Sequence, residues 1–279
     1  MKEIISNPYI IEKKKERRKV LITEILLFVL IVVLWEVLAR INVINDFLFS
    51  YPTEIIKIIV NYFRTGEIYL HIGISLLETI LGLVIGTLLG IIIAVILWWN
   101  KFLSKVLDPF LVVLNALPKT ALAPILIIWV GTGIKGITVV AISISVVITI
   151  ISCYNYFNNV EEEKIKMFKS FGASKWQILW KLIIPSNIPN IISIIKINIG
   201  MTWVGVIVGE FLVSRAGIGY LIVYGSQVFK MDVVMAGVII LAIIFDKFNR
   251  FAIILYAHVI TSKKIVIKLL ENTLILILI

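Results

Sequence analysis

We single out four of the ionisable side chains that lie within or beside long apolar segments of the sequence. They are Glu78, Lys119, Lys196 and Glu210. A charged group at membrane depth is costly, so each of these residues is a candidate for a functional site. We predict that Lys119 attracts an anionic solute and that Glu210, just before a glycine-rich turn, lies at an outer gate. The alternative for Lys119 is a structural role, in which the side chain extends to the membrane–water interface or pairs with an acid.

Other residue types that carry out chemistry occur singly. His71 and His258 have no second histidine at ligand spacing, and Cys153 is the sole cysteine. The run from Gly131 to Gly136 does not have the spacing of the phosphate-binding loop G-x-x-x-x-G-K-[ST]. We therefore expect no catalytic residue, no metal site and no ATP hydrolysis in this chain. Packing or interface roles are expected for the histidines and the cysteine.

The stretch from Leu117 to Pro124 places Lys119 between two prolines. Proline removes a backbone donor and clashes with the preceding turn, so a helix through this stretch must break or bend. Lipid offers no partner to the carbonyl groups that a break leaves free, so the break is expected to face protein or a water-filled cavity. We predict a translocation path here, lined by Pro118, Lys119 and Pro124. A plain structural kink is the alternative.

Long apolar helices must position these residues. With 60% hydrophobic residues, 16% charged residues and a mean hydropathy of +1.06, the chain is too apolar for a soluble globular domain. We predict an all-α integral membrane protein with about six transmembrane helices, since a span needs roughly 20 apolar residues. The expected spans are Leu21 to Arg40, Ile72 to Trp99, Val106 to Val130, Ile137 to Phe157, Ile191 to Val213 and Val233 to Phe245. The last is short unless it begins near Met231, thins the bilayer or continues as one helix into Phe251 to Ile260.

The net charge of +10 is distributed between alternate loops. With the N-terminus in the cytoplasm, nineteen of the 27 Lys and Arg residues fall on the cytoplasmic side, six fall outside, and Lys119 and Lys196 fall inside apolar segments. This asymmetry predicts that both termini lie in the cytoplasm. It also makes nucleic acid a poorer explanation of the charge than a cell membrane, where we expect the chain to be a multi-pass protein.

Three regions follow from these segments. We expect a basic cytoplasmic arm (1–20), a transmembrane domain (21–250) and an atypical, poorly packed C-terminal tail (251–279). Within the second predicted span, small residues recur every four positions, which favours close packing against another helix. They are Gly82, Gly86, Gly90 and Ala94. In the external link at 42–70, Pro52 predicts the first turn of a short surface helix.

A polar loop at 158–190 joins the fourth and fifth spans. Ser174 and Gln177 form a capping-box pattern that begins a helix, and Gly172 suits a tight turn after a preceding helix. We expect the second helix to end at Pro185. The product is a cytoplasmic hairpin with an aromatic and basic surface, either docked on a partner or lying on membrane lipid, and the residues alone leave both open.

At this point the sequence resembles the permeases of ABC importers. Gly172 is followed after nine residues by Leu182-Ile183-Ile184-Pro185, which matches the end of the EAA loop motif of that family. The run from Phe171 to Gln177 is similar to the nitrate, sulfonate and taurine branch. Leu117 to Pro124 and Gly209 to Leu221 supply two further matches in the same order, and the resemblance covers about residues 50 to 245.

The sequence also departs from the family pattern. Lys166, Met167 and Phe168 occupy the positions of the EAA triplet, so the residue that makes the usual polar contact with the ATPase is left open. Glu78 follows Ser75 at a place where many relatives carry arginine. We place Glu78 with the translocation-path residues, and a role in helix pairing alone is the alternative.

The resemblance implies a transport subunit rather than an enzyme. It implies a homodimer of permeases, two cytoplasmic ABC ATPase subunits that bind ATP and Mg, and an extracytoplasmic solute-binding protein, with no cofactor on this chain. The residues that it assigns to the coupling helix against the ATPase are Lys169, Ser170, Phe171, Gly172, Ala173, Ser174 and Trp176. The expected solute is a small anion of the sulfonate, taurine or nitrate type. The alternatives are a vitamin-precursor pyrimidine, or an ion-coupled secondary transporter.

Overall fold

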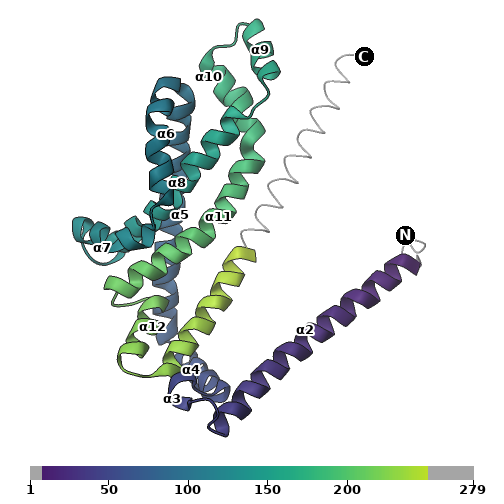
Figure 1. The fold of residues 1–279 in the computed structure, drawn as a ribbon, viewed down its shortest axis with the longest axis vertical. Coiled ribbons are helices and arrows are strands. Elements are labelled where there is room, and N and C mark those ends of the chain that lie inside the picture. Colours follow the sequence, from purple (N-terminus) through teal and green to yellow (C-terminus); the bar gives the residue numbers. More distant parts are fainter. Residues whose placement is uncertain (1–7, 251–279) are drawn as a thin grey trace. The chain divides into compact units, whose positions relative to one another are not determined.

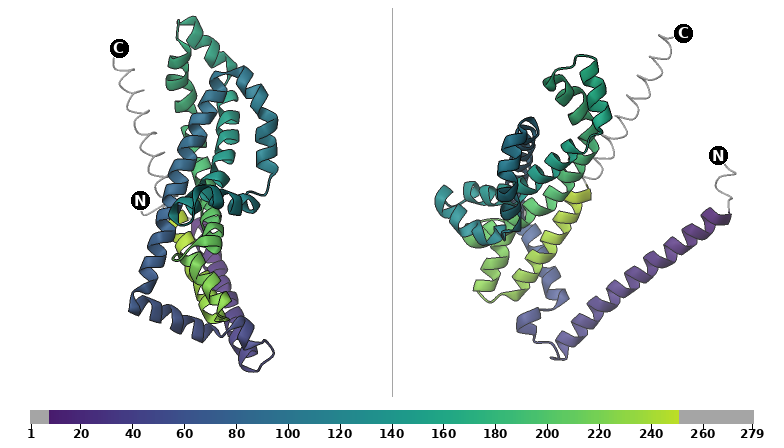
Figure 2. Two further views of the ribbon diagram at one scale, coloured as in Figure 1. Left: turned by 90° about the vertical axis from the view of Figure 1, so that its left-hand side faces the viewer. Right: turned by 45° about the horizontal axis from the view of Figure 1, so that its top comes forward.

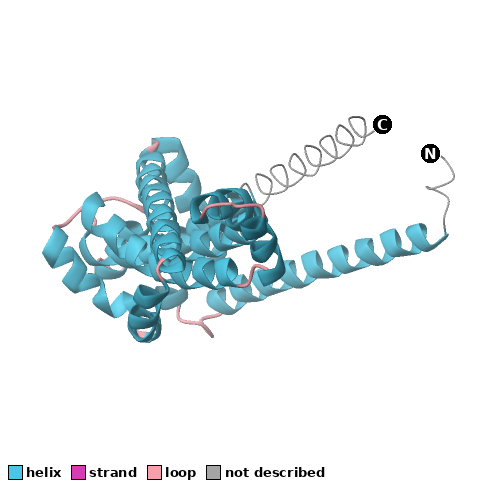
Figure 3. Cartoon of the chain, turned by 90° about the horizontal axis from the view of Figure 1, so that it is seen from above, coloured by secondary structure: helices cyan, strands magenta, loops and turns pink. Residues whose placement is uncertain are grey.

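The computed structural model describes residues 8–250, and these form helices and connecting loops only (Figure 3). The chain divides into two compact units. Among the described residues, the first comprises 8–65 and 224–236, and the second comprises 66–223 and 237–250. The predicted properties of the 251–279 tail lie outside the described residues.

The first unit contains a long helix and two short ones. These are α2 (Pro8–Arg40), α3 (Asp46–Phe49) and α4 (Pro52–Thr65). Glu36 near the end of α2 accepts hydrogen bonds from the Thr53 backbone N–H at 3.1 Å and its hydroxyl at 2.9 Å, and pairs with Arg40 at 2.6 Å. The Glu36 carboxylate therefore holds the start of α4. The short helix predicted from Pro52 is confirmed.

The second unit contains the helices that carry the candidate sites (Figure 1). They are α5 (Glu67–Trp99), α6 (Lys101–Ala116), α7 (Lys119–Val130), α8 (Ile134–Asn158), α9 (Glu162–Ser170), α10 (Lys175–Ile178), the π-helical turn η1 (Leu179–Ile183), α11 (Ile184–Val213) and α12 (Ile218–Gln227). The helices α5, α8 and α11 pack side by side, as the views of Figures 1 and 2 agree. Both α12 and the following helical segment, residues 231–250, cross the boundary between the units.

The stripe of small residues on α5 packs against α8. A Cβ atom added to Gly82 would lie 2.7 Å from Ala141 Cβ, and one added to Gly90 would overlap Thr149. Gly205 on α11 approaches the same alanine from another helix, since its Cβ would lie 2.7 Å from Ala141 Cα. Small residues thus bring three backbones together around Ala141, and the helix-packing interpretation of the stripe is confirmed.

A buried amide joins these three helices. Asn198 on α11 donates to Thr87 Oγ1 on α5 at 2.9 Å and to Thr149 Oγ1 on α8 at 2.7 Å. All three side chains are buried. Polar groups in a membrane bundle stabilise helix pairs through such bonds, so Asn198 fixes the register of α5, α8 and α11.

The predicted third span is two helices rather than one. The chain bends by 101° between α6 and α7, at Leu117 and Pro118. The break expected from the prolines is confirmed. Pro109 and Pro124, by contrast, are accommodated inside α6 and α7.

Within residues 8–250, four helices are long and apolar enough to cross a membrane, and the bent pair makes a fifth candidate. They correspond to the first five predicted spans. The helix of the sixth begins at Met231, as one of the alternatives predicted, and continues through Asp246, Lys247 and Arg250. Together with Asp232, these charged side chains interrupt the apolar stretch, so this helix is not among the candidate spans. The predicted continuation into Phe251 to Ile260 lies outside the described residues.

Candidate functional site

The hairpin expected around Gly172 is present at the end of α9. Gly172 has a φ of +75°, a conformation that glycine adopts without strain, and the chain reverses there between α9 and α10. Ser174 accepts a hydrogen bond from the Gln177 N–H, and the Gln177 side chain accepts from the Ser174 N–H, which completes the predicted capping box. The Phe171 side chain at the tip is 83% exposed. The turn therefore presents a large apolar side chain on the surface of the chain.

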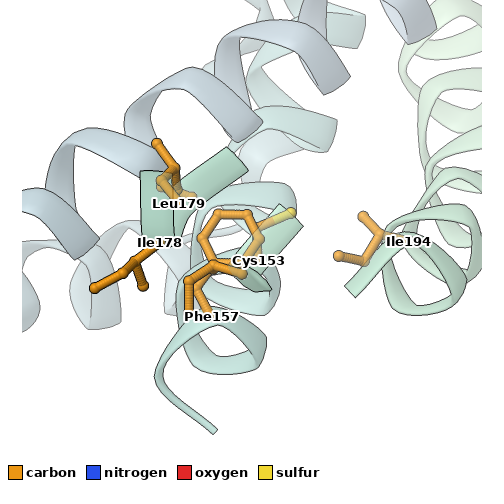
Figure 4. Packing of buried hydrophobic residues seen from close by; sticks show 7 residues of the cluster. Cys153, Phe157, Ile178, Leu179 and Ile194 are labelled. Atoms are coloured by element: carbon orange, nitrogen blue, oxygen red, sulfur yellow. The ribbon is translucent and has the colours of Figure 1, made fainter. Parts of the chain in front are cut away.

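The base of the hairpin is fixed by apolar packing. Ile178 and Leu179 lie buried against Cys153 and Phe157 of α8, together with Ile194 of α11 (Figure 4). The lone cysteine is thus a packing residue, as predicted. This cluster attaches the hairpin to α8 and α11, which are long and apolar enough to cross a membrane.

The prediction that the second hairpin helix ends at Pro185 is wrong. The helix runs on from α10 through η1 into α11, and Pro185 lies in the first turn of α11. Proline is tolerated where the hydrogen bonding changes from the π to the α pattern, because its missing N–H resembles that of a helix start. The hairpin is therefore continuous with a membrane-spanning helix of 39 residues, Lys175–Val213.

Lys119 is the first residue of α7, directly after the break, as the sequence predicted. Its ammonium group donates to the Asn115 carbonyl oxygen at 3.0 Å, so it satisfies an acceptor near the end of α6. No ion pair links it to a carboxylate within the described residues. Pro118 and Pro124 are exposed on the surface of the single chain. No acid within residues 8–250 therefore neutralises the charge at the break.

Glu210 is buried, with 1% of its surface exposed. It accepts hydrogen bonds from the Ser75 hydroxyl at 2.5 Å and from the Gly219 N–H at 2.6 Å. Ser75 Oγ accepts from the Ile218 N–H at 2.9 Å, and His71 Nδ1 accepts from the Gly217 N–H at 3.0 Å. Side chains from α5 and α11 thus cap the first turn of α12, whose N–H groups have no partner within the helix.

Glu78 joins the same cluster from α5. Its carboxyl group contacts that of Glu210, and it too is 1% exposed. Gly217 has a φ of +119°, and a Cβ there would overlap the Glu210 carboxylate. Only glycine fits this turn, which the cap holds against α5.

The structure therefore brings together Glu78 and Glu210 but leaves Lys119 outside their hydrogen-bond network. Both carboxyl groups are buried in this conformation, and their predicted place on a translocation path stays a prediction. The capping roles of His71 and Ser75 were not predicted, although His71, Ser75 and Glu78 share one helix face by their spacing. Asn198 was also missed; an amide inside an apolar run was the available signal.

These features define a class, a multi-pass helical membrane protein with a broken helix and a rigid cytoplasmic hairpin. Residues 86–264 match the family described as "Binding-protein-dependent transport system inner membrane component". The match covers more than half of the sequence, and the chain belongs to this family. It is a permease subunit rather than an enzyme.

Comparison with individual proteins agrees with this assignment. The chain is 28% identical over 224 residues to a putative aliphatic sulfonates transport permease of Bacillus subtilis, covering 79% of this chain and 80% of that one. It is 26% identical over 195 residues to a formylaminopyrimidine transport permease of Halalkalibacterium halodurans, covering 70% and 77%. The fold is similar to a chain of the inward-facing MetNI methionine ABC transporter, with a TM-score of 0.52 and 17% identity over 64% of this chain and 93% of that one.

Proposed function

We propose that this chain forms, as a homodimer, the translocation path of an ATP-driven importer for a small anionic solute of the sulfonate type. The observation that carries the proposal is Lys119 at the 101° break, a cation without an acidic partner among the described residues. The name of the Bacillus subtilis relative supports the choice of a sulfonate. Glu78 and Glu210 would act on the path by holding α12 against α5.

The proposed partners are two ATPase subunits, which bind ATP and Mg, and an extracytoplasmic solute-binding protein. Family membership implies the ATPase. The hairpin is its proposed contact, through Phe171 and the residues that flank it: Lys169, Ser170, Gly172, Ala173, Ser174 and Trp176. Exposure of the tip and burial of the base support this role. Closure of the ATPase pair would move the hairpins and, through α11, the membrane helices.

Replacement of Phe171 with alanine is expected to weaken binding of the ATPase by about 30-fold, as for an aromatic anchor at an interface. Stability of the permease should change by less than about 0.5 kcal/mol, because the side chain is exposed. The measurement is the affinity of purified permease for its ATPase. Phe102→Ala is the matched control, since Phe102 is 77% exposed on α6. Equal loss in both variants would count against the hairpin contact.

Replacement of Lys119 with methionine is expected to lower uptake about tenfold, since a charge focused in a cleft raises the local concentration of its ligand. Basal ATPase activity of the assembled complex should stay within twofold. The assay is uptake of a labelled alkanesulfonate into proteoliposomes containing permease, ATPase and binding protein. Lys135→Met, at an exposed position of α8, is the control. Equal loss of uptake and ATPase activity would indicate an assembly defect instead.

A pyrimidine solute is the second candidate, because one relative is named as a formylaminopyrimidine permease. Ligand screening of the partner binding protein separates the two. Binding of alkanesulfonates supports the anion, and binding of an uncharged pyrimidine contradicts it. Uptake by the permease alone, driven by an ion gradient without ATP, would contradict the importer mechanism as a whole.

A further inference from the structure

A cavity of about 530 Å³ lies at the base of the hairpin. It is lined by residues from the ends of five helices: Trp98 of α5, Lys101 of α6, Asn158 of α8, Lys169 of α9 and Lys175 of α10 are among them. All belong to the second unit of the chain. The cavity is separate from the α6–α7 break and from the carboxyl cluster described above.

The charge around this cavity is mostly positive. Lys101, Lys169 and Lys175 contribute three ammonium groups, and Glu162 contributes the single acid among its lining residues. The Glu162 carboxylate is already paired with Lys166 at 3.3 Å. Within residues 8–250 none of the three lysines forms an ion pair. The cavity is therefore complementary to an anion.

Trp98 lines the cavity, and an aromatic wall formed by the rings of Trp99, Trp176 and Trp180 lies next to it. The Lys175 ammonium lies 5.0 Å from the Trp99 ring centroid, and donates to the Trp99 carbonyl oxygen. Trp99 contacts Trp176 with ring centroids 6.1 Å apart, and Trp176 contacts Trp180 at 5.6 Å. Trp99, Trp176 and Trp180 are 40%, 58% and 53% exposed. An amphipathic aromatic surface thus adjoins the cationic cavity.

The depth of this surface follows from α5. Residues 80–99 are twenty consecutive residues without a charged side chain, which is the length needed to cross about 30 Å of hydrocarbon. Trp98 and Trp99 end this stretch, so they lie at the headgroup level, where tryptophan is enriched. The excess of Lys and Arg in the same loops assigns this end to the cytoplasmic leaflet, which carries anionic lipids. Phe171, at the hairpin tip, lies outside the aromatic wall.

We propose that this cavity binds the phosphate headgroup of an anionic phospholipid from the cytoplasmic leaflet. Lys101, Lys169 and Lys175 contact the phosphate, and the exposed rings of Trp99, Trp176 and Trp180 lie along the upper acyl chains. Under this proposal Lys169 and Trp176 contact the lipid in place of the ATPase, and the ATPase contact is confined to residues 170–174. Because the lysines come from α6, α9 and α10, one bound lipid links both arms of the hairpin to the end of a transmembrane helix. The lipid thereby steadies the hairpin from the side opposite the tip.

The test is native mass spectrometry of the purified full chain, titrated with phosphatidylglycerol and phosphatidylcholine of identical acyl chains. We expect preferential binding of phosphatidylglycerol. The variant K101Q/K169Q/K175Q should bind it at least about tenfold more weakly than K105Q/K181Q/K247Q, a control that removes three exposed cytoplasmic lysines outside the cavity; each lysine near an anionic headgroup contributes about fivefold. The variant K101R/K169R/K175R should retain binding, which separates loss of charge from loss of folding.

Four outcomes would overturn the proposal. Equal binding of the two lipids would remove the headgroup preference, and equal loss in the cavity and control variants would show general electrostatic attraction. Displacement of the lipid by millimolar inorganic phosphate would identify a site for a soluble anion. Displacement by the purified ATPase would place the cavity inside the protein interface.

Discussion

Replacement of Gly205 with alanine is expected to lower the free energy of unfolding by about 3 kcal/mol, at the upper end of overpacking effects in tight cores. The added Cβ would lie 2.7 Å from Ala141 Cα and 3.3 Å from Ala141 N. These are backbone atoms of α8, so the contact cannot be relieved by a change of rotamer. The helices α8 and α11 must separate, which also disturbs the Asn198 hydrogen bonds to Thr87 and Thr149.

The matched control lies on the same helix. An added Cβ at Gly200 meets a single neighbour, Phe245 Cζ at 3.9 Å, which is an ordinary contact distance. Gly200→Ala should therefore be neutral or stabilising by up to about 1 kcal/mol, from helix propensity. Both variants can be compared by thermal unfolding of the purified chain in detergent. Similar midpoints for the two would mean that the helices do not approach as closely as described.

Replacement of Glu210 with alanine is expected to cost roughly 3 kcal/mol or more. The change removes the acceptor for the Ser75 hydroxyl, the Gly219 N–H and the contact with Glu78. A buried polar group left without its partner costs about 1–3 kcal/mol. The start of α12 would lose its attachment to α5, so uptake should fall together with stability.

Two variants make this result interpretable. Glu210→Gln retains one acceptor oxygen and should fall between the wild type and Glu210→Ala in the midpoint of thermal unfolding. Glu163→Ala removes an exposed glutamate of α9 and should stay within about 0.5 kcal/mol of the wild type. If Glu210→Ala lowers uptake but leaves the midpoint unchanged, Glu210 acts on the solute and the cap is unimportant.

The two largest effects fall on different parts of the mechanism that we propose. Gly205 lies where three membrane helices approach one another, which is needed for motion of the hairpin to reach the bundle as a rigid displacement. Glu210 holds the turn before α12, and a solute does not contact it in the present conformation because it is buried. A gating role for this turn would therefore operate through release of the cap, which is a two-state change of packing.

Local chemistry in the sequence accounts for much of the architecture. The lengths of the apolar runs predict six spans, and five of them are candidate spans in the structure. The prolines around Lys119 predict the break, and Gly172 with Ser174 predicts the hairpin turn. Each of these signals acts over a few residues, through helix length, a missing donor, a left-handed turn or a cap. The spacing of Gly82, Gly86 and Gly90 goes one step further, since it predicts a close helix contact but not the partner helix.

Tertiary structure decided what depends on residues far apart in the chain. The bond from the Gly217 N–H to His71 joins positions 146 residues apart, and that from Lys175 to the Trp99 carbonyl joins positions 76 apart. No local pattern encodes such distances, because they follow from how α5, α8 and α11 pack. The same packing carries the hairpin helix through Pro185 into α11 and buries Glu78 and Glu210. The sequence by itself thus determined five of the membrane helices, the broken span and the hairpin. Only the tertiary structure determined that Glu210, in contact with Glu78, caps α12, and that Lys119 has no acidic partner among residues 8–250.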